Sequence, residues 1–185
     1  EIENVNSMAN NATMNVICVS VMSEGGYELR GRSRTAGHLP NSSYTLSTAG
    51  IFYPVISIRL KSEYADAIVL PKTISLLGLG GNGTRMAYKL IANSSISGGN
   101  WVSAGTDSAV QYNIGGSSMS GGTDLDQGYV YVSQQSSFAL QIVDDIFRAQ
   151  LERNSFIGTN STFTLAVAGA TNNDTCIGAI NWAEI

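Results

Sequence analysis

The sequence has few charged residues, a single histidine and only two cysteines. Charged side chains make up 13% of the 185 residues, about half the usual share, and the net charge is −4. A chain without a basic surplus has no electrostatic footprint for nucleic acid or for an anionic membrane surface. No run of about 18 apolar residues occurs, so no transmembrane helix is predicted. We therefore expect neither nucleic acid nor a membrane as a partner.

The shortage of histidine limits the chemistry that the chain can perform. Any Ser-His-Asp or Cys-His arrangement must use His38, which lies in the loop-like segment 36–40. No Gly-x-Ser-x-Gly elbow is present, and one histidine with two distant cysteines makes a poor zinc ligand set. We interpret His38 as a structural or exposed histidine. The prediction is a protein that is not an enzyme, with no catalytic, cofactor-binding or metal-binding residue and no small-molecule substrate.

The two cysteines, Cys18 and Cys176, lie near opposite ends of the chain. They could form one bridge between an N-terminal and a C-terminal strand, or they could be two buried thiols that pack as small apolar groups. The second interpretation is favoured, and the redox compartment stays open. Because the chain opens with Glu1 and shows no signal peptide, we expect a processed product or a piece of a longer protein.

A glycine-rich segment and an acidic segment each match part of a binding motif. Segment 78–83 has the letters of the dinucleotide fingerprint, Gly-x-Gly-x-x-Gly, but too little chain follows it for a βαβ unit. Asn82-Gly83, between two alternating runs, indicates a hairpin instead. Segment 124–128, Asp-Leu-Asp-Gln-Gly, is like the start of a calcium loop, but no Glu stands where that loop should end. We interpret it as a turn between strands.

Three other polar groupings favour plain structural interpretations. Arginines recur at every second position, which fits the solvated face of an edge strand better than a phosphate-binding strip. Adjacent carboxylates point apart on a strand and lie about 100° apart on a helix, so the pair at 144–145 is a weak catalytic signal. Asn-x-Ser/Thr triplets are acceptor sites for N-linked glycans in secreted proteins, but a chain so rich in Asn, Ser and Thr contains several by chance, so we attribute them to composition. The residues concerned are Arg30, Arg32, Arg34, Asp144, Asp145, Asn11, Asn41, Asn82, Asn93, Asn160 and Asn173.

The run Gly50–Lys61 predicts a central strand. Its first half is apolar on both faces, and from Ser57 onward apolar and polar residues alternate, as in a strand that is covered at one end and meets water at the other. Pro54 lacks a backbone donor, so we place it at an edge or a bulge. The predicted core residues are Ile56, Ile58, Leu60, Leu76, Leu165 and Trp182.

Short alternating runs separated by Gly- and Ser-rich turns continue along the chain. Such spacing predicts an all-β fold, a two-sheet β-sandwich or jelly-roll-like domain with at most one or two short helices. We assign residues 1–13 to an N-terminal arm or linker and residues 14–185 to a single sandwich domain. The other predicted strands are 14–22, 27–32, 67–70, 73–77, 84–92, 101–102, 109–114, 128–133, 162–167 and 176–185.

Three segments carry further expectations. Residues 33–47 are predicted to be a loop, and Pro71 is predicted to end the strand 67–70. The segment 84–92 also satisfies helical spacing, but the strand is favoured. Residues 137–153 are the best candidate for a helix or a strand followed by a helix, with Asp144 as its N-cap.

Several stretches together resemble a family of structural proteins from tailed bacteriophage virions, over the region from about Arg34 to the end. These stretches are Tyr53-Pro54-Val55-Ile56-Ser57-Ile58-Arg59-Leu60-Lys61, Ala67-Ile68-Val69-Leu70-Pro71, Tyr88-Lys89-Leu90-Ile91, Gly99-Asn100-Trp101, Asp107-Ser108-Ala109-Val110-Gln111-Tyr112, Ser120-Gly121-Gly122-Thr123, Gln127-Gly128-Tyr129-Val130 and Ala179-Ile180-Asn181-Trp182-Ala183-Glu184-Ile185.

The resemblance implies a β-sandwich module of a capsid, neck, tail or baseplate that works by assembly with identical copies and other virion proteins. It implies a location in the virion and no catalytic residue. The alternative from the composition is a subunit of a bacterial fimbrial or surface adhesin, which would have an upstream secretion signal and an oxidised Cys18–Cys176 bridge.

Overall fold

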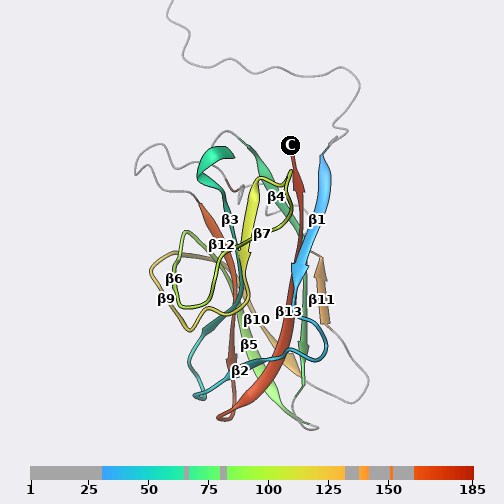
Figure 1. Cartoon of the computed structure of the whole chain (residues 1–185). Helices are drawn as coiled ribbons and strands as arrows, with labels where there is room; N and C mark the ends of the chain where they lie inside the picture. Colours follow the sequence, from blue (N-terminus) through green and yellow to red (C-terminus); the bar gives the residue numbers. More distant parts are fainter. Residues whose placement is uncertain (1–30, 65–66, 80–82, 132–137, 142–150, 152–160) are drawn as a thin grey trace, which may run out of the picture.

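The computed structural model describes residues 31–64, 67–79, 83–131, 138–141, 151 and 161–185. Two antiparallel sheets face each other across the core (Figure 1). Sheet A has the strand order β1-β13-β4-β11, with β2 also paired to β13, and sheet B has the order β10-β5-β12-β3-β8-β7. Their bounds are β1 Arg32–Gly37, β2 Tyr44–Leu46, β3 Tyr53–Leu60, β4 Val69–Gly78, β5 Arg85–Ala92, β7 Val102–Ser103, β8 Val110–Asn113, β10 Thr123–Tyr131, β11 Phe138–Gln141, β12 Thr162–Gly169 and β13 Asp174–Glu184.

The strand pairing is that of a jelly roll. The first described strand pairs with the last, β1 with β13, and the next pairs are β3 with β12, β4 with β11 and β5 with β10, all antiparallel. A long hairpin rolled into two layers has this order, and it is the double-sheet architecture found in viral capsid and lectin domains. The predicted all-β, jelly-roll-like sandwich is therefore confirmed.

The core lies between the sheets, where alternate residues of each strand meet. All six predicted core residues are at most 2% exposed: Ile56, Ile58, Leu60, Leu76, Leu165 and Trp182. The central run forms β3, which lies between β12 and β8. Pro54 borders a bulge where the pairing of β3 with β12 shifts. The regular hydrogen bonds of the sheet are interrupted there, so the missing N–H of proline is tolerated.

Two predictions around proline and loop residues are wrong. Pro71 does not end a strand, because β4 runs through it, and a bulge at Lys72 realigns the strand with β13. Residues 33–47 are not one loop, since they contain most of β1 and all of β2. Their strand character comes from pairing with β13 at the other end of the sequence, which no local pattern reveals.

The predictions for segments 78–92 and 124–128 have mixed outcomes. Segment 84–92 is strand β5, as predicted. The hairpin at Asn82-Gly83 is wrong, because β4 belongs to sheet A and β5 to sheet B, so the connection crosses between sheets. The turn at 124–128 is also wrong: these residues lie within β10, with Leu125 as the extra residue of a bulge.

A small two-stranded antiparallel sheet, β6 (Ser95–Ser97) with β9 (Ser118–Ser120), lies outside sheet B (Figure 1). Ser57 and Thr164 point away from the core but are fully buried beneath this excursion. Their hydroxyls form a chain with Ser94, at 2.9 Å between Ser57 and Thr164 and 3.0 Å between Thr164 and Ser94. The outer face of sheet B is therefore covered in part by the chain itself.

The described chain enters and leaves the sandwich at the same end. A Cβ on Gly31 would lie 2.6 Å from the carbonyl oxygen of Glu184, and Ile68 and Ile185 exchange two backbone hydrogen bonds of 3.3 and 2.9 Å. In Figure 1 the C-terminus lies beside the start of β1. One 3-10 turn, η1 (Ser62–Tyr64), lies near this end. Among the described residues, no helix is long and apolar enough to cross a membrane.

Several predictions fall outside the described residues. These are the arm 1–13, the strand 14–22, most of the strand 27–32, the helix within 137–153, and the residues Asn11, Cys18, Arg30, Asn82, Asp144, Asp145 and Asn160. Within 137–153, β11 supplies a strand at Phe138–Gln141, and Leu151 forms an antiparallel bridge with Val69.

Candidate functional site

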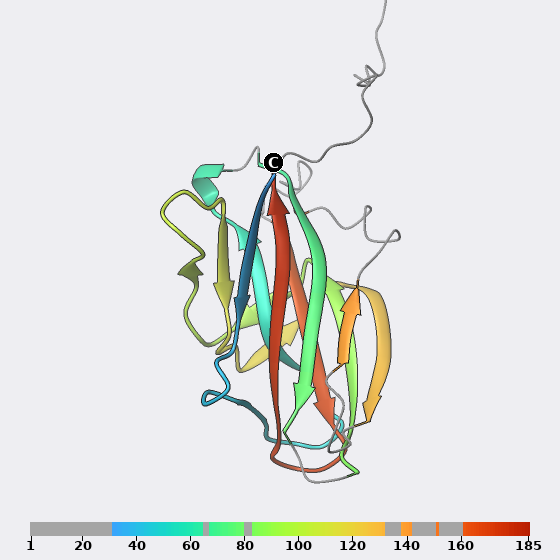
Figure 2. The ribbon, with the colours of Figure 1, turned by 90° about the vertical axis from the view of Figure 1, so that its right-hand side faces the viewer.

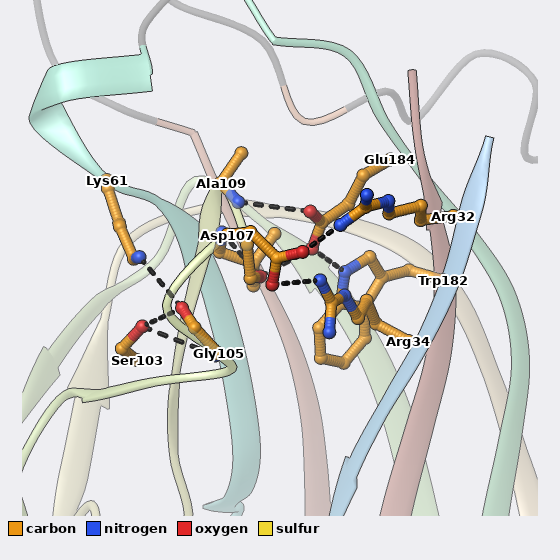
Figure 3. A network of polar contacts seen from close by, with 11 residues as sticks. Arg32, Arg34, Lys61, Ser103, Gly105, Asp107, Ala109, Trp182 and Glu184 are labelled. Carbon is orange, nitrogen blue, oxygen red and sulfur yellow. Dashed lines mark hydrogen bonds and ion pairs between the residues drawn. The ribbon is translucent and has the colours of Figure 1, made fainter.

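Among the described residues, a large group of polar contacts lies where β1, the loop between β7 and β8, and the end of β13 meet (Figure 3). We call this group the polar junction. It joins an edge of sheet A to an edge of sheet B. Its members are Arg32, Arg34, Asp107, Ser108, Ala109, Trp182 and Glu184.

Glu184 is the centre of the junction. Its Oε1 accepts hydrogen bonds from the Ser108 hydroxyl at 2.6 Å and from the Trp182 indole Nε1 at 2.8 Å. Its Oε2 accepts the backbone N–H of Ala109 at 3.0 Å. Charge-assisted hydrogen bonds of this kind are about twice as strong as neutral ones. The carboxylate is thus occupied by three donors and fixes the loop of sheet B to the last strand of sheet A.

Asp107 binds both arginines of β1. Its Oδ1 accepts from Arg34 at 2.7 Å, and its Oδ2 pairs with Arg32. The Arg32 side chain is 69% exposed and the Arg34 side chain 24% exposed. The predicted edge position of Arg32 and Arg34 is confirmed, since β1 pairs only with β13 among the described strands. The predicted solvated face is wrong for Arg34, because the register places it opposite the buried Trp182, on the face that looks toward sheet B. Both arginines share the single carboxylate of Asp107, which the sequence analysis did not single out.

The loop between β7 and β8 is also held from its other side. The Lys61 ammonium donates to the carbonyl oxygen of Gly105 at 3.3 Å, and the Ser103 hydroxyl donates to the same oxygen at 2.6 Å (Figure 3). The Ser108 hydroxyl donates to a Glu184 carboxylate that already accepts from Trp182 and Ala109, so its hydrogen bond is one of three that hold this carboxylate in place. The arrangement is a structural joint between two sheets.

His38 forms a second joint between the sheets. It lies in the gap between β1 and β2, where its backbone N–H donates to Gly178 of β13 at 3.0 Å. With the ring proton on Nε2, the ring accepts the Gly178 N–H at 3.4 Å and donates to the carbonyl oxygen of Ile114, which follows β8, at 3.2 Å. The imidazole therefore links the backbone of β13 in sheet A to the segment that follows β8 in sheet B. These contacts agree with the structural interpretation of His38.

Burial shifts the pKa of two groups near β2. The Cys176 thiol is fully buried, and its burial together with the charge of Asp174 raises its pKa to about 12. Burial raises the pKa of Tyr44 to about 12 as well, with smaller contributions from Tyr53 and Cys176. A thiol whose pKa is this high is a poor nucleophile. Cys176 thus behaves as an apolar core residue, as the favoured interpretation predicts.

The acidic residues of β10 do not converge on one point. Asp124 pairs with Lys89 of β5, whereas Asp126 accepts a hydrogen bond from the Tyr88 hydroxyl at 3.4 Å. Burial and Asp126 raise the pKa of Tyr88. Within the described residues, no group of three or more potential metal ligands occurs. The segment is a bulged strand whose carboxylates already have partners, and its geometry is not that of a calcium loop.

The glycine-rich segment leads into a strand rather than a helix. Gly78 ends β4, Gly83 has a φ of +95°, and β5 begins at Arg85. A dinucleotide site requires a helix N-terminus at the glycines to bind the pyrophosphate. That requirement is not met by the described residues on either side of the segment, so the letters of the fingerprint match without its structural context.

Comparison with known proteins gives no family model that matches the chain, and no curated protein or solved structure matches it either.

Sequence reasoning missed the carboxylates of the polar junction. Asp107 and Glu184 are far apart in the sequence, and each lies in an unremarkable context, a Gly-Thr-Asp-Ser turn and the end of the last strand. The alternating arginines of β1 were a usable signal, because an arginine that points toward the inside of a sandwich needs an acidic partner.

Proposed function

We propose that this protein is a non-enzymatic structural component of a bacteriophage virion that works by assembling with identical copies and neighbouring virion proteins. The observation that supports the proposal most directly is the jelly-roll pairing of β1 with β13, β3 with β12, β4 with β11 and β5 with β10. Jelly rolls are a common architecture of capsid domains, although the fold alone does not imply a function. The sequence resemblance to virion proteins of tailed phages adds the second support.

The polar groups of the described residues are compatible with a rigid building block. The most conspicuous ones, Glu184, Asp107 and His38, connect one sheet to the other and so stiffen the sandwich. Buried polar networks whose groups are satisfied rigidify a fold, which suits a part that bears load between neighbours.

The position of the preceding residues suggests how the domain is attached. Residues 1–30 lead into β1 at the end where Ile185 lies, and residues 2–13 are rich in asparagine, with Ile2, Val5 and Met8 as their only large apolar side chains. Such a segment buries too little apolar surface to offset its own ordering entropy, so we propose that a neighbouring protein orders it. The sandwich would then be attached at this end.

The decisive experiment locates the chain in purified particles. Mass spectrometry and immunogold labelling should find it at a fixed copy number in virions, and a chain found instead on the bacterial surface would favour the adhesin alternative. Deleting residues 2–13 should leave the melting temperature of the isolated protein unchanged and impair incorporation into particles. A control in which residues 2–13 are replaced by a Gly/Ser segment of equal length separates the role of the sequence from that of the length. Normal incorporation of both variants would refute the docking role.

A further inference from the structure

Arg59 of β3 extends from the outer face of sheet B. Its neighbours Ile58 and Leu60 are fully buried in the core, so the alternation of the strand directs Arg59 to the opposite side of the sheet. The register places it between Thr162 of β12 and Gln111 of β8. Figure 2 is seen from the side of sheet A, with β1, β13 and β4 in front, so the outer face of sheet B is turned away from the viewer.

Two contacts hold the guanidinium group of Arg59 in one orientation. Its Nε donates to Oε1 of Gln111 at 3.1 Å, and its Cζ lies 4.1 Å from the centroid of the Trp101 ring. The stacking fixes the plane of the group, and the hydrogen bond fixes its rotation within that plane. A ligand therefore meets an arginine that has already lost most of its conformational freedom.

Nη1 and Nη2 of Arg59 have no acceptor within the described part of the chain, because its two contacts use Nε and the face of the group. Both reach solvent, since Arg34 Nε is the only buried side-chain nitrogen without a partner among the described residues. The Gln111 amide adds a further donor: only its oxygen can accept from Nε, and its Nε2 has no partner among these residues either. The groups left unoccupied are donors, and they require a ligand that accepts.

Arg59 differs in this respect from the other cations that the structure holds in place. Those bind a carboxylate or a backbone carbonyl: they are Arg32 and Arg34 with Asp107, Lys89 with Asp124, and Lys61 with Gly105. Burial lowers the pKa of Arg59, as expected for a charge that is partly removed from water without a carboxylate beside it. Such a charge costs free energy that a bound anion would offset.

The free edge of this guanidinium suits a carboxylate. Nη1 and Nη2 present two parallel N–H groups, which match the two oxygens of one carboxylate in a bidentate pair. A single fixed arginine supplies one positive charge, which balances a monoanion. A phosphate dianion would keep an unbalanced charge against a protein whose net charge is −4. Lys61, which follows β3, does not add to the pair of donors, because its ammonium donates to Gly105.

We propose that Arg59, Trp101 and Gln111 form a binding site for a monoanionic carboxylate on the outer face of sheet B. The carboxylate pairs with Nη1 and Nη2 of Arg59, while Trp101 and Gln111 are positioning residues that hold the guanidinium. Simple organic acids and acidic sugars both carry this group. The inference goes beyond the proposed function and does not depend on it, because it rests only on the contacts of these three residues.

NMR of the isotope-labelled full-length chain tests the inference. The signals are the Nε–H of Arg59 and the indole N–H of Trp101, each assigned by its loss in Arg59→Lys and Trp101→Phe. Sodium acetate replaces sodium chloride stepwise, so that the ionic strength stays constant. Both signals should shift and saturate with a dissociation constant in the millimolar range, because one half-buried ion pair supplies most of the affinity. The indole of Trp182, which is fully buried, should not shift.

Substitutions separate the paired donors from the charge. Arg59→Lys keeps the charge but not the two parallel N–H groups, so acetate should bind at least about fivefold more weakly, as measured on the Trp101 indole. Gln111→Leu leaves Arg59 in place but frees its Nε, and it should also weaken binding, which tests the site even if Arg59→Lys lowers the stability. Arg85→Lys is the matched control at an exposed arginine on the outer face of the same sheet, and it should leave the affinity unchanged.

D-glucuronate, D-glucose and phosphate define the ligand class. D-glucuronate should shift both signals: tighter binding than acetate identifies an acidic sugar as the ligand, and equal or weaker binding identifies a simple organic acid. D-glucose, which lacks the carboxylate, should shift neither, and binding of D-glucose would show that the carboxylate is not the recognised group. Phosphate that binds more tightly than acetate would refute the monoanion. The site itself would be refuted by the lack of a saturable shift with both carboxylates, by equal weakening in Arg85→Lys, or by full affinity in both Arg59→Lys and Gln111→Leu.

Discussion

Trp182 and Glu184, two residues apart on β13, are joined by a hydrogen bond of 2.8 Å from the indole Nε1 to Oε1. Alternation along the strand points both side chains toward sheet B, where Trp182 is fully buried. The indole N–H needs an acceptor once it is buried, and Glu184 supplies it while also binding Ser108 and Ala109. A single carboxylate on the last strand therefore accepts the hydrogen bond of the buried indole and holds the loop between β7 and β8.

Replacing that carboxylate should destabilise the whole sandwich. Glu184→Ala leaves three donors without their acceptor, and hydrogen bonds to charged groups contribute about 1.5–3 kcal/mol each, so we expect a loss of about 3 kcal/mol. Glu184→Gln keeps the size and one acceptor and should cost about half as much. Urea denaturation followed by Trp fluorescence measures both. Glu63→Gln, an exposed acidic residue of η1, is the control, and an equal loss in that variant would contradict the assignment.

The two arginines of β1 should contribute unequally, although they share Asp107. Arg32 is mostly exposed, and exposed ion pairs contribute about 0–1 kcal/mol, so Arg32→Ala should have little effect. Arg34 is the more buried partner, so Arg34→Ala removes the packing of its aliphatic stem in addition to its charge. This substitution should therefore lower the free energy of unfolding by more, about 1–2 kcal/mol. A double-mutant cycle with Asp107→Asn at low and high salt separates these contributions. Equal effects of the two arginine substitutions would contradict this ranking.

Stability should fall in alkaline solution because of Cys176 and Tyr44. Their folded pKa values of about 12 lie above the ordinary values of 9 and 10, so the folded protein retains protons that the unfolded chain loses. The contribution of both groups is therefore complete below pH 9 and is lost progressively as the pH rises from 9 to about 12. Urea midpoints at a series of pH values from neutral to alkaline measure the effect. Cys176→Ala should flatten the profile, and an unchanged slope in that variant would show that the buried thiol is not its source.

The local parts of this structure could be predicted, and the long-range parts could not. The alternation of β3, β5 and β12 depends on neighbouring residues, so their strands and their core residues, such as Ile56 and Leu165, follow from the sequence. Strand β1 is stabilised by its backbone pairing with β13, in which Arg32 lies opposite Glu184. No short window of the sequence contains both partners. In the same way, Pro71 suggests a break until the bulge at Lys72 and the partner strand are known.

The candidate sites show the same division. His38 could be recognised as a structural residue from its loop context and from the shortage of partners. The joint that it forms could not be predicted, because Gly178 and Ile114 come together only through the jelly-roll order. Segment 124–128 was misinterpreted for a related reason. Asp, Gln and Gly are typical of turns, but the tertiary pairing of β10 with β5 overrides that preference, and the glycine is needed for packing.

Gly128 provides a direct test of that last point. A Cβ at this position would lie 2.7 Å from both Cε1 and the hydroxyl oxygen of Tyr88, the residue opposite it on β5. The ring has little room to move, because Tyr88 is buried and belongs to the core cluster. Gly128→Ala should therefore destabilise the protein by about 1–3 kcal/mol through overpacking. Gly115→Ala is the matched control, since its Cβ would meet its nearest atom at 3.5 Å, an ordinary contact. If segment 124–128 were a solvated turn, both substitutions would have the same small effect on the urea midpoint; a selective loss in Gly128→Ala is the expected result for a paired strand.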